Sequence, residues 1–209
     1  ERRDGIIQMT FHTNGGPLQW GGGPHREFPQ AFADVGSDTG NRVVIMTGTG
    51  DSFSGPAGTP QGTPKRAPRE WDATYWEGKR LLTNLLDIEV PMISAINGPA
   101  LRHSEIPLLC DIVLASDEAL FQDSGHFMSG LVPGDGMHIV YPMLLGLNRG
   151  RYFLLTGQSI GAQEAQQLGL VNEVLPQGDL VPRAWALAEQ LSQQSDLKTE
   201  CRVFSDLLR

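Results

Sequence analysis

The chain has 209 residues, a formal net charge of −8 and a sequence pI near 5.0. This length suits one domain with a substantial core, and the acidic balance argues against a nucleic-acid surface, which would need clustered lysine and arginine. No stretch approaches the roughly 20 apolar residues that cross a bilayer, and the N-terminus lacks a signal-peptide pattern. We therefore expect a cytoplasmic protein that binds neither nucleic acid nor membranes.

The first elements alternate between extended and helical patterns. Residues 5–13 predict a strand, because β-branched and aromatic residues alternate there before the breaker NGGP. A short helix is expected over 27–35. The apolar run at 43–47 is typical of a buried parallel strand.

A glycine- and proline-rich segment, residues 51–69, predicts a long irregular loop. Residues 71–86 then have the spacing of a helix. The side chains expected to face the core from this helix are Tyr75, Leu82, Leu85 and Leu86.

The second half continues the same alternation. Strands are predicted at 91–96, at 111–115, ending at Phe121, and at 170–175. Helices are predicted at 136–145 with an interruption at Pro142, at 162–168 with closure by Gly169, at 180–191, and at the end of the chain. Alternating strands and helices indicate an α/β fold.

Four segments together resemble the crotonase (enoyl-CoA hydratase/isomerase) superfamily. They are 91–100 (PMISAINGPA), 110–115 (CDIVLA), 155–158 (LTGQ) and 169–174 (GLVNEV). The resemblance implies a spiral of ββα turns over residues 1–176. Residues 177–209 would begin a C-terminal helical region used for trimerisation, of which most is expected to be missing here.

Two further segments are similar to 6-oxocamphor hydrolase and related β-diketone hydrolases within that superfamily. They are 121–136 (FQDSGHFMSGLVPGDG) and 148–158 (NRGRYFLLTGQ). This likeness implies hydrolysis of a carbon–carbon bond in a small diketone, without a cofactor, by a homotrimer or a dimer of trimers.

His126 stands where the resemblance places the second of the two glutamates that handle water in a hydratase. Glu105 stands at the first position, and we group it with the substrate-binding residues. A histidine is a competent general base near neutral pH. The resemblance assigns the catalytic dyad to His126 and Asp135, with Asp135 fixing the histidine tautomer. Capping of the helix that is predicted to begin at Gly136 is the other role open to Asp135.

The resemblance also implies that His103 and Trp20 hold the carbonyl oxygens of the substrate. His103 lies in LRH, where hydratases have a glycine-rich stretch that supplies a backbone oxyanion hole. His25 matches a further active-site histidine of the family, whereas His12 is expected to be structural, and His138 is expected either to pack or to support the active-site residues from behind. No histidine pair has the close spacing of a metal motif, so we predict no metal site.

The leading hypothesis is a retro-Claisen hydrolysis that converts a cyclic β-diketone to a keto acid. His126 would deprotonate a water, which attacks one carbonyl, and the second carbonyl would accept the electrons of the breaking bond. Two alternatives stay open: an enoyl-CoA hydratase or isomerase, which Glu105 supports, and a non-catalytic binding protein with the same fold.

Overall fold

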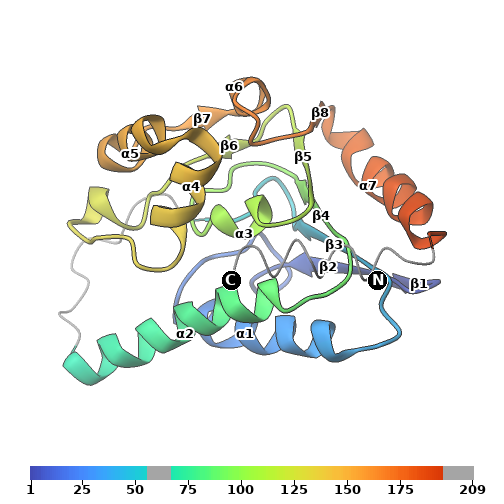
Figure 1. The fold of residues 1–209 in the computed structure, drawn as a ribbon, viewed down its shortest axis with the longest axis horizontal. Coiled ribbons are helices and arrows are strands. Elements are labelled where there is room, and N and C mark those ends of the chain that lie inside the picture. Colours follow the sequence, from blue (N-terminus) through green and yellow to red (C-terminus); the bar gives the residue numbers. More distant parts are fainter. Residues whose placement is uncertain (56–66, 195–209) are drawn as a thin grey trace.

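The computed structural model describes residues 1–55 and 67–194. A twisted sheet runs through its centre in the order β1-β2-β3-β4-β5-β8, and every neighbouring pair is parallel except β1 with β2. The strands are β1 (Arg2–Arg3), β2 (Ile6–Phe11), β3 (Val43–Gly48), β4 (Met92–Ile96), β5 (Ile112–Ser116) and β8 (Glu173–Leu175). Helices lie on both sides of this sheet (Figure 1). The α/β class and the parallel sheet expected from the sequence are thus present.

The two central strands carry apolar residues on both faces. All five residues of β4 are buried, as are the first five of β3, which explains their continuous apolar sequences. Helix α7 (Gln177–Ser192) covers one face through Leu180, Ala184 and Ala188, which recur every four residues. Residues 177–192 therefore pack on the sheet itself, while a trimerisation role for 177–209 stays a prediction.

Two long helices form a separate layer below the sheet in the view of Figure 1. They are α1 (Gly22–Ser37) and α2 (Pro68–Leu86), which pack against each other. The expected inward position of Tyr75 is wrong, because its side chain is 57% exposed. Leu85 is fully buried as predicted, and Leu81 is fully buried as well, whereas Leu82 and Leu86 are only half-buried.

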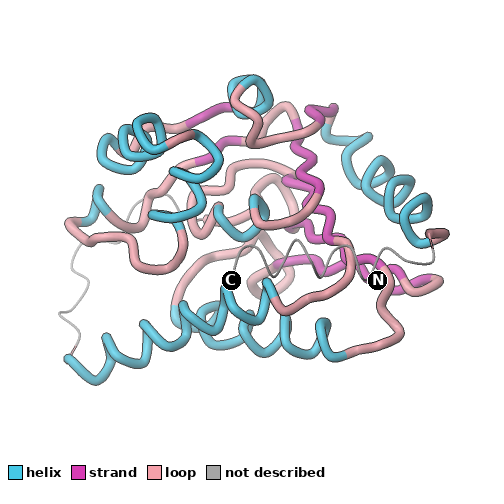
Figure 2. The backbone as a smooth tube through the Cα atoms, in the orientation of Figure 1, coloured by secondary structure: helices cyan, strands magenta, loops and turns pink. Residues whose placement is uncertain are grey.

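Shorter elements from the second half of the chain share one hydrophobic core with α1 and α2, on the side of the sheet opposite α7 (Figure 2). They are α3 (Glu105–Leu108), the two-stranded sheet of β6 (Leu120–Phe121) and β7 (Ile160–Gly161), the 3-10 turn Phe127–Ser129, α4 (Met137–Leu145), α5 (Leu147–Thr156) and α6 (Ala162–Gln167). The predicted interruption at Pro142 does not occur, because α4 continues to Leu145 and ends at Gly146, whose φ is +79°.

Two predicted segments lie wholly or partly outside the described residues: the loop at 51–69 and the helix at the end of the chain. Among the described helices, none combines the length and apolar character that a membrane crossing requires.

Candidate active site

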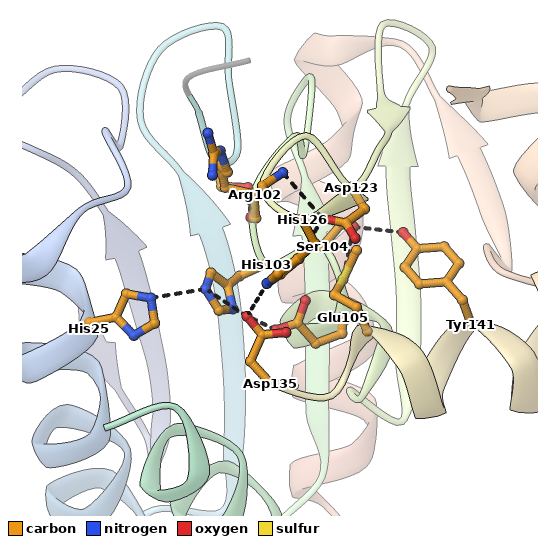
Figure 3. Close-up of polar contacts among 12 residues, drawn as sticks. His25, Arg102, His103, Ser104, Glu105, Asp123, His126, Asp135 and Tyr141 are labelled. Carbon is orange, nitrogen blue, oxygen red and sulfur yellow. Dashed lines mark hydrogen bonds and ion pairs between the residues drawn. The ribbon is translucent and has the colours of Figure 1, made fainter. Parts of the chain in front are cut away.

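The candidate site gathers at the carboxyl ends of the central strands, where parallel α/β sheets commonly place ligands. Its side chains come from separate parts of the chain (Figure 3). His103 and Glu105 follow β4, and Asp123 and His126 follow β6. Asp135 precedes α4. Asn97 stabilises this edge, because its side chain accepts a hydrogen bond from Gly48 N and donates one to Gly50 O.

His126 lies between two carboxylates. Its Nδ1 is 2.7 Å from Asp123 Oδ1, and its Nε2 is 3.0 Å from Asp135 Oδ2. Burial opposes the charged imidazolium, but the hydrogen bonds and negative charges of the two aspartates outweigh it and raise the pKa of His126 to about 10. His126 is therefore an imidazolium at neutral pH in this geometry, and a base reaction needs the neutral fraction that grows as the pH rises.

His103 is held by a second acid. Its Nδ1 is 2.6 Å from Glu105 Oε1, and its Nε2 points toward Asp135 Oδ2 at 3.5 Å. Burial lowers the pKa of His103, but the nearby carboxylates of Glu105 and Asp135 outweigh that effect and raise it. The backbone of His103 is left-handed, with φ +49°, a conformation that costs free energy in a residue with a Cβ. The buried hydrogen bond between Ser104 and Tyr141, at 2.7 Å, stabilises the next residue of this turn.

Glu105 is fully buried, and its expected role in substrate binding stays a prediction. Its side chain has no exposed surface, and it stands behind His103 rather than facing open space. Its contact with His103 Nδ1 orients that imidazole.

Asp135 is shared by the two histidines through one oxygen. Burial would favour the neutral acid, but the positive charges of His103 and His126 lower the pKa of Asp135 well below its usual range. The alternative role as a helix cap is wrong: α4 begins after Gly136, and no side chain caps it. Gly136 has φ +109°, and a Cβ there would lie 2.4 Å from Leu82, so only glycine lets the chain turn so close to α2.

Trp20 and His25 line the other side of His103. The Trp20 and His103 rings lie 4.1 Å apart between centroids, and His25 Nε2 is 3.3 Å from His103 Nε2. Trp20 Nε1 is buried and has no acceptor among the described residues. A buried N–H without an acceptor costs about 1–3 kcal/mol, so a ligand carbonyl at this position would remove that cost.

A pocket of about 260 Å³ opens between α1 and α2 beside His25. Its lining is both polar and apolar and consists of Gly22, His25, Arg26, Glu70, Ala73, Thr74 and Glu77. His25 thus connects this pocket to the histidine and carboxylate cluster.

All six residues singled out from the sequence are neighbours in one cluster. The contact between His126 and Asp135 is present, and His103 joins it through the same aspartate. Sequence reasoning missed Asp123, although it lies three residues before His126, at a spacing that brings side chains together in a turn. His138 was predicted to pack or support the site, but it is exposed on α4. Among the described residues, no group of three His, Cys, Asp or Glu side chains is arranged to hold a metal ion.

Comparison with known protein families shows to which family this chain belongs. Residues 1–204 match the family described as enoyl-CoA hydratase/isomerase. The chain belongs to this family. Within the enoyl-CoA hydratase/isomerase family, a probable peroxisomal enoyl-CoA hydratase 1 of Arabidopsis thaliana is 32% identical over 166 residues, which cover 79% of this chain and 61% of the relative. A putative enoyl-CoA hydratase of Thermus thermophilus is 30% identical over 187 residues, which cover 86% and 70%.

A solved structure is more similar in sequence. The β-diketone hydrolase ABDH of the cyanobacterium Anabaena sp. PCC 7120, bound to (S)-3-oxocyclohexyl acetic acid, is 50% identical with a TM-score of 0.94. The match covers 99% of this chain and 84% of that one. By contrast, the chain spans about three fifths of the length of the first curated hydratases that it matches.

Proposed function

We propose that this protein hydrolyses a carbon–carbon bond of a cyclic β-diketone by a retro-Claisen reaction. The observation that carries the proposal is the convergence of His126 and His103 on Asp135, beside the buried and unpaired N–H of Trp20. Such a site combines a proton acceptor with donors for two carbonyl oxygens. The likeness to a β-diketone hydrolase at 50% identity supports the same reading.

The proposed reaction needs only water and the diketone. Neutral His126 takes a proton from water as the oxygen attacks one carbonyl carbon, and the oxygen of that carbonyl becomes anionic. When this intermediate collapses, the bond to the central carbon breaks and its electrons form an enolate on the second carbonyl. The His126 imidazolium then returns its proton to the enolate carbon, which gives a keto acid.

His103 and Trp20 are proposed to stabilise the negative charge that develops on the carbonyl oxygens. His103 is buried, and its neighbouring carboxylates raise its pKa, which favours the charged imidazolium. Trp20 Nε1–H can only donate a hydrogen bond. Donors already aimed at the site need no reorganisation when the charge appears, and this is why such groups accelerate acyl transfer.

The geometry favours this reaction over hydration of an enoyl thioester. Hydratases of the family are expected to hold water with two glutamates, but Glu105 is fully buried and committed to His103 Nδ1. Its unpaired oxygen, Oε2, is likewise buried. Glu105 therefore does not present a carboxylate to an incoming water.

Turnover of a cyclic 1,3-diketone tests the proposal directly. Loss of the ultraviolet enol band is expected with purified protein, and kcat/KM is expected to rise with pH toward about 10 as His126 loses its proton. Turnover of an enoyl-CoA but not of the diketone would establish the hydratase reading, and no turnover of either compound would favour a binding protein.

We also propose that the protein self-associates through α4 and α5. The large apolar side chains exposed on these helices are Ile139, Met143, Leu144, Leu147, Tyr152 and Leu155. An apolar surface of this kind is typical of an interface between subunits.

Light scattering is expected to give a trimer or hexamer of the 22.8 kDa chain. The double variant Met143→Asp/Leu155→Asp should lower this mass, whereas Tyr75→Asp on α2 should not. A monomeric parent protein would contradict the proposal.

A further inference from the structure

The two central histidines are arranged alike. Each directs Nδ1 to a buried carboxylate, His126 to Asp123 at 2.7 Å and His103 to Glu105 at 2.6 Å. Each directs Nε2 to the same oxygen of Asp135. Asp123 and Glu105 therefore each hold one imidazole at Nδ1, whereas Asp135 lies between the two imidazoles at Nε2 (Figure 3).

Asp123 is firmly held behind His126. Its side chain is only 3% exposed, and the oxygen that contacts His126 also accepts a hydrogen bond from Gly125 N at 3.2 Å. It lies two residues after the end of β6, which pairs with β7 and bridges to Ala100 after β4. A carboxylate in such a place can hold the Nδ1–H of an imidazole in one orientation.

Asp135 faces a more open position. Its side chain is 14% exposed, against 3% for Asp123, although Oδ1 of Asp135 and Oδ2 of Asp123 are both buried and have no hydrogen-bond partner among the described residues. The Nε2 side of the His126 imidazole is therefore the more exposed of the two, and a water or substrate oxygen would approach from there. Nδ1 of His126 is not accessible to a water or substrate oxygen, because it is already hydrogen-bonded to Asp123.

We infer that Asp123, rather than Asp135, is the positioning residue that fixes the tautomer of His126. In this arrangement the neutral imidazole carries its proton on Nδ1, and Nε2 exchanges a proton with water. Asp135 then acts on the reacting side, where it stabilises the imidazolium once Nε2 is protonated. The inference rests on the proposed diketone hydrolysis and changes the roles within the dyad expected from the sequence.

Several charged groups besides Asp123 influence the ionisation of His126. Asp135 contacts it directly, His103 lies across Asp135, and Arg102 lies close enough to Asp123 to interact with its charge. Glu105 is bonded to His103 on the far side of the cluster. A test must therefore change Asp123 alone and follow His126 itself.

The test is Asp123→Asn, which keeps the shape of the side chain and removes its charge. Nitrogen NMR of histidine-labelled protein reports the tautomer and titration of His126 without substrate, and kinetics with the diketone report kcat/KM across pH. Asp117→Asn is the matched control, because Asp117 is an exposed aspartate at the end of β5.

Neutral His126 is expected to carry its proton on Nδ1 in the wild-type protein and to become a mixture of tautomers in Asp123→Asn. The ascending limb of kcat/KM should move to lower pH, because loss of the negative partner lowers the pKa of His126. The plateau should fall by about 10²-fold or more, as expected for a base held in the wrong tautomer. Asp117→Asn should change none of these.

Two results would overturn the inference. One is an unchanged tautomer, titration and pH profile in folded Asp123→Asn. The other needs no variant: wild-type protein whose neutral His126 carries its proton on Nε2. If the wild-type protein cleaves no diketone, the proposed function fails, but the NMR measurements still decide the role of Asp123.

Discussion

His126→Ala is expected to lower kcat/KM for the diketone by about 10²–10⁴-fold, the usual contribution of a general base. Under the proposed mechanism the loss should appear in kcat rather than in KM, because His126 would act on the water and the enolate carbon while Trp20 and His103 would hold the carbonyl oxygens. Stopped-flow or steady-state assays of the ultraviolet enol band at several pH values measure the loss of kcat/KM. The rise of kcat/KM toward pH 10 should also disappear with the imidazole.

His138→Ala is the matched control for this loss. His138 lies twelve residues further along the chain and is exposed on α4, so its removal should leave kcat and KM unchanged. Activity retained by His126→Ala, with normal folding in both variants, would remove His126 from the mechanism.

Asp135→Asn is expected to lower kcat/KM by about 10²–10³-fold through a different physical effect. The substitution removes the one negative charge that both His126 and His103 share. The pKa of His126 should therefore fall, so that more of it is neutral at pH 7. Activity should nevertheless drop, because the imidazolium formed during the reaction loses its stabilising partner. Unlike Asp123→Asn, this variant should keep the Nδ1–H tautomer, which histidine NMR can show.

The same variant should change how stability depends on pH. The pKa of His126 is about 10 in the folded protein and near 6.5 when unfolded. The contribution of His126 to stability is therefore complete below about pH 6.5 and is lost as the pH rises toward 10. Denaturant unfolding at a series of pH values should show a smaller alkaline loss in Asp135→Asn than in the wild-type protein. Equal alkaline losses would contradict the electrostatic role of Asp135.

The strands were the most predictable part of the fold. β3 and β4 are buried on both faces, so their sequences are continuous apolar runs, which indicate strands of a parallel sheet. The faces of α2 were less predictable, because Tyr75 is apolar enough to fit the helical pattern yet points away from the core. Helix α5 had no prediction from periodicity at all, since its half-exposed apolar residues blur the pattern.

The candidate site was likewise only partly predictable from the sequence. Motif likeness could select His126, Asp135 and His103, because those residues stand in segments that carry the family resemblance. It could not show that Glu105 is buried behind His103 or that Asp135 leaves α4 uncapped. Both facts depend on how the turn after β4 and the loop before α4 are packed together.

By itself, the sequence determined that this is an α/β chain of the enoyl-CoA hydratase/isomerase family with a histidine where a glutamate is expected. Only the tertiary structure decided which acid contacts which imidazole nitrogen. The reason is physical: tautomer and pKa depend on atoms within a few ångströms, and Asp135 reaches both His126 and His103 from a different segment, while the local contacts of Asp123 and Glu105 depend on how their turns are folded.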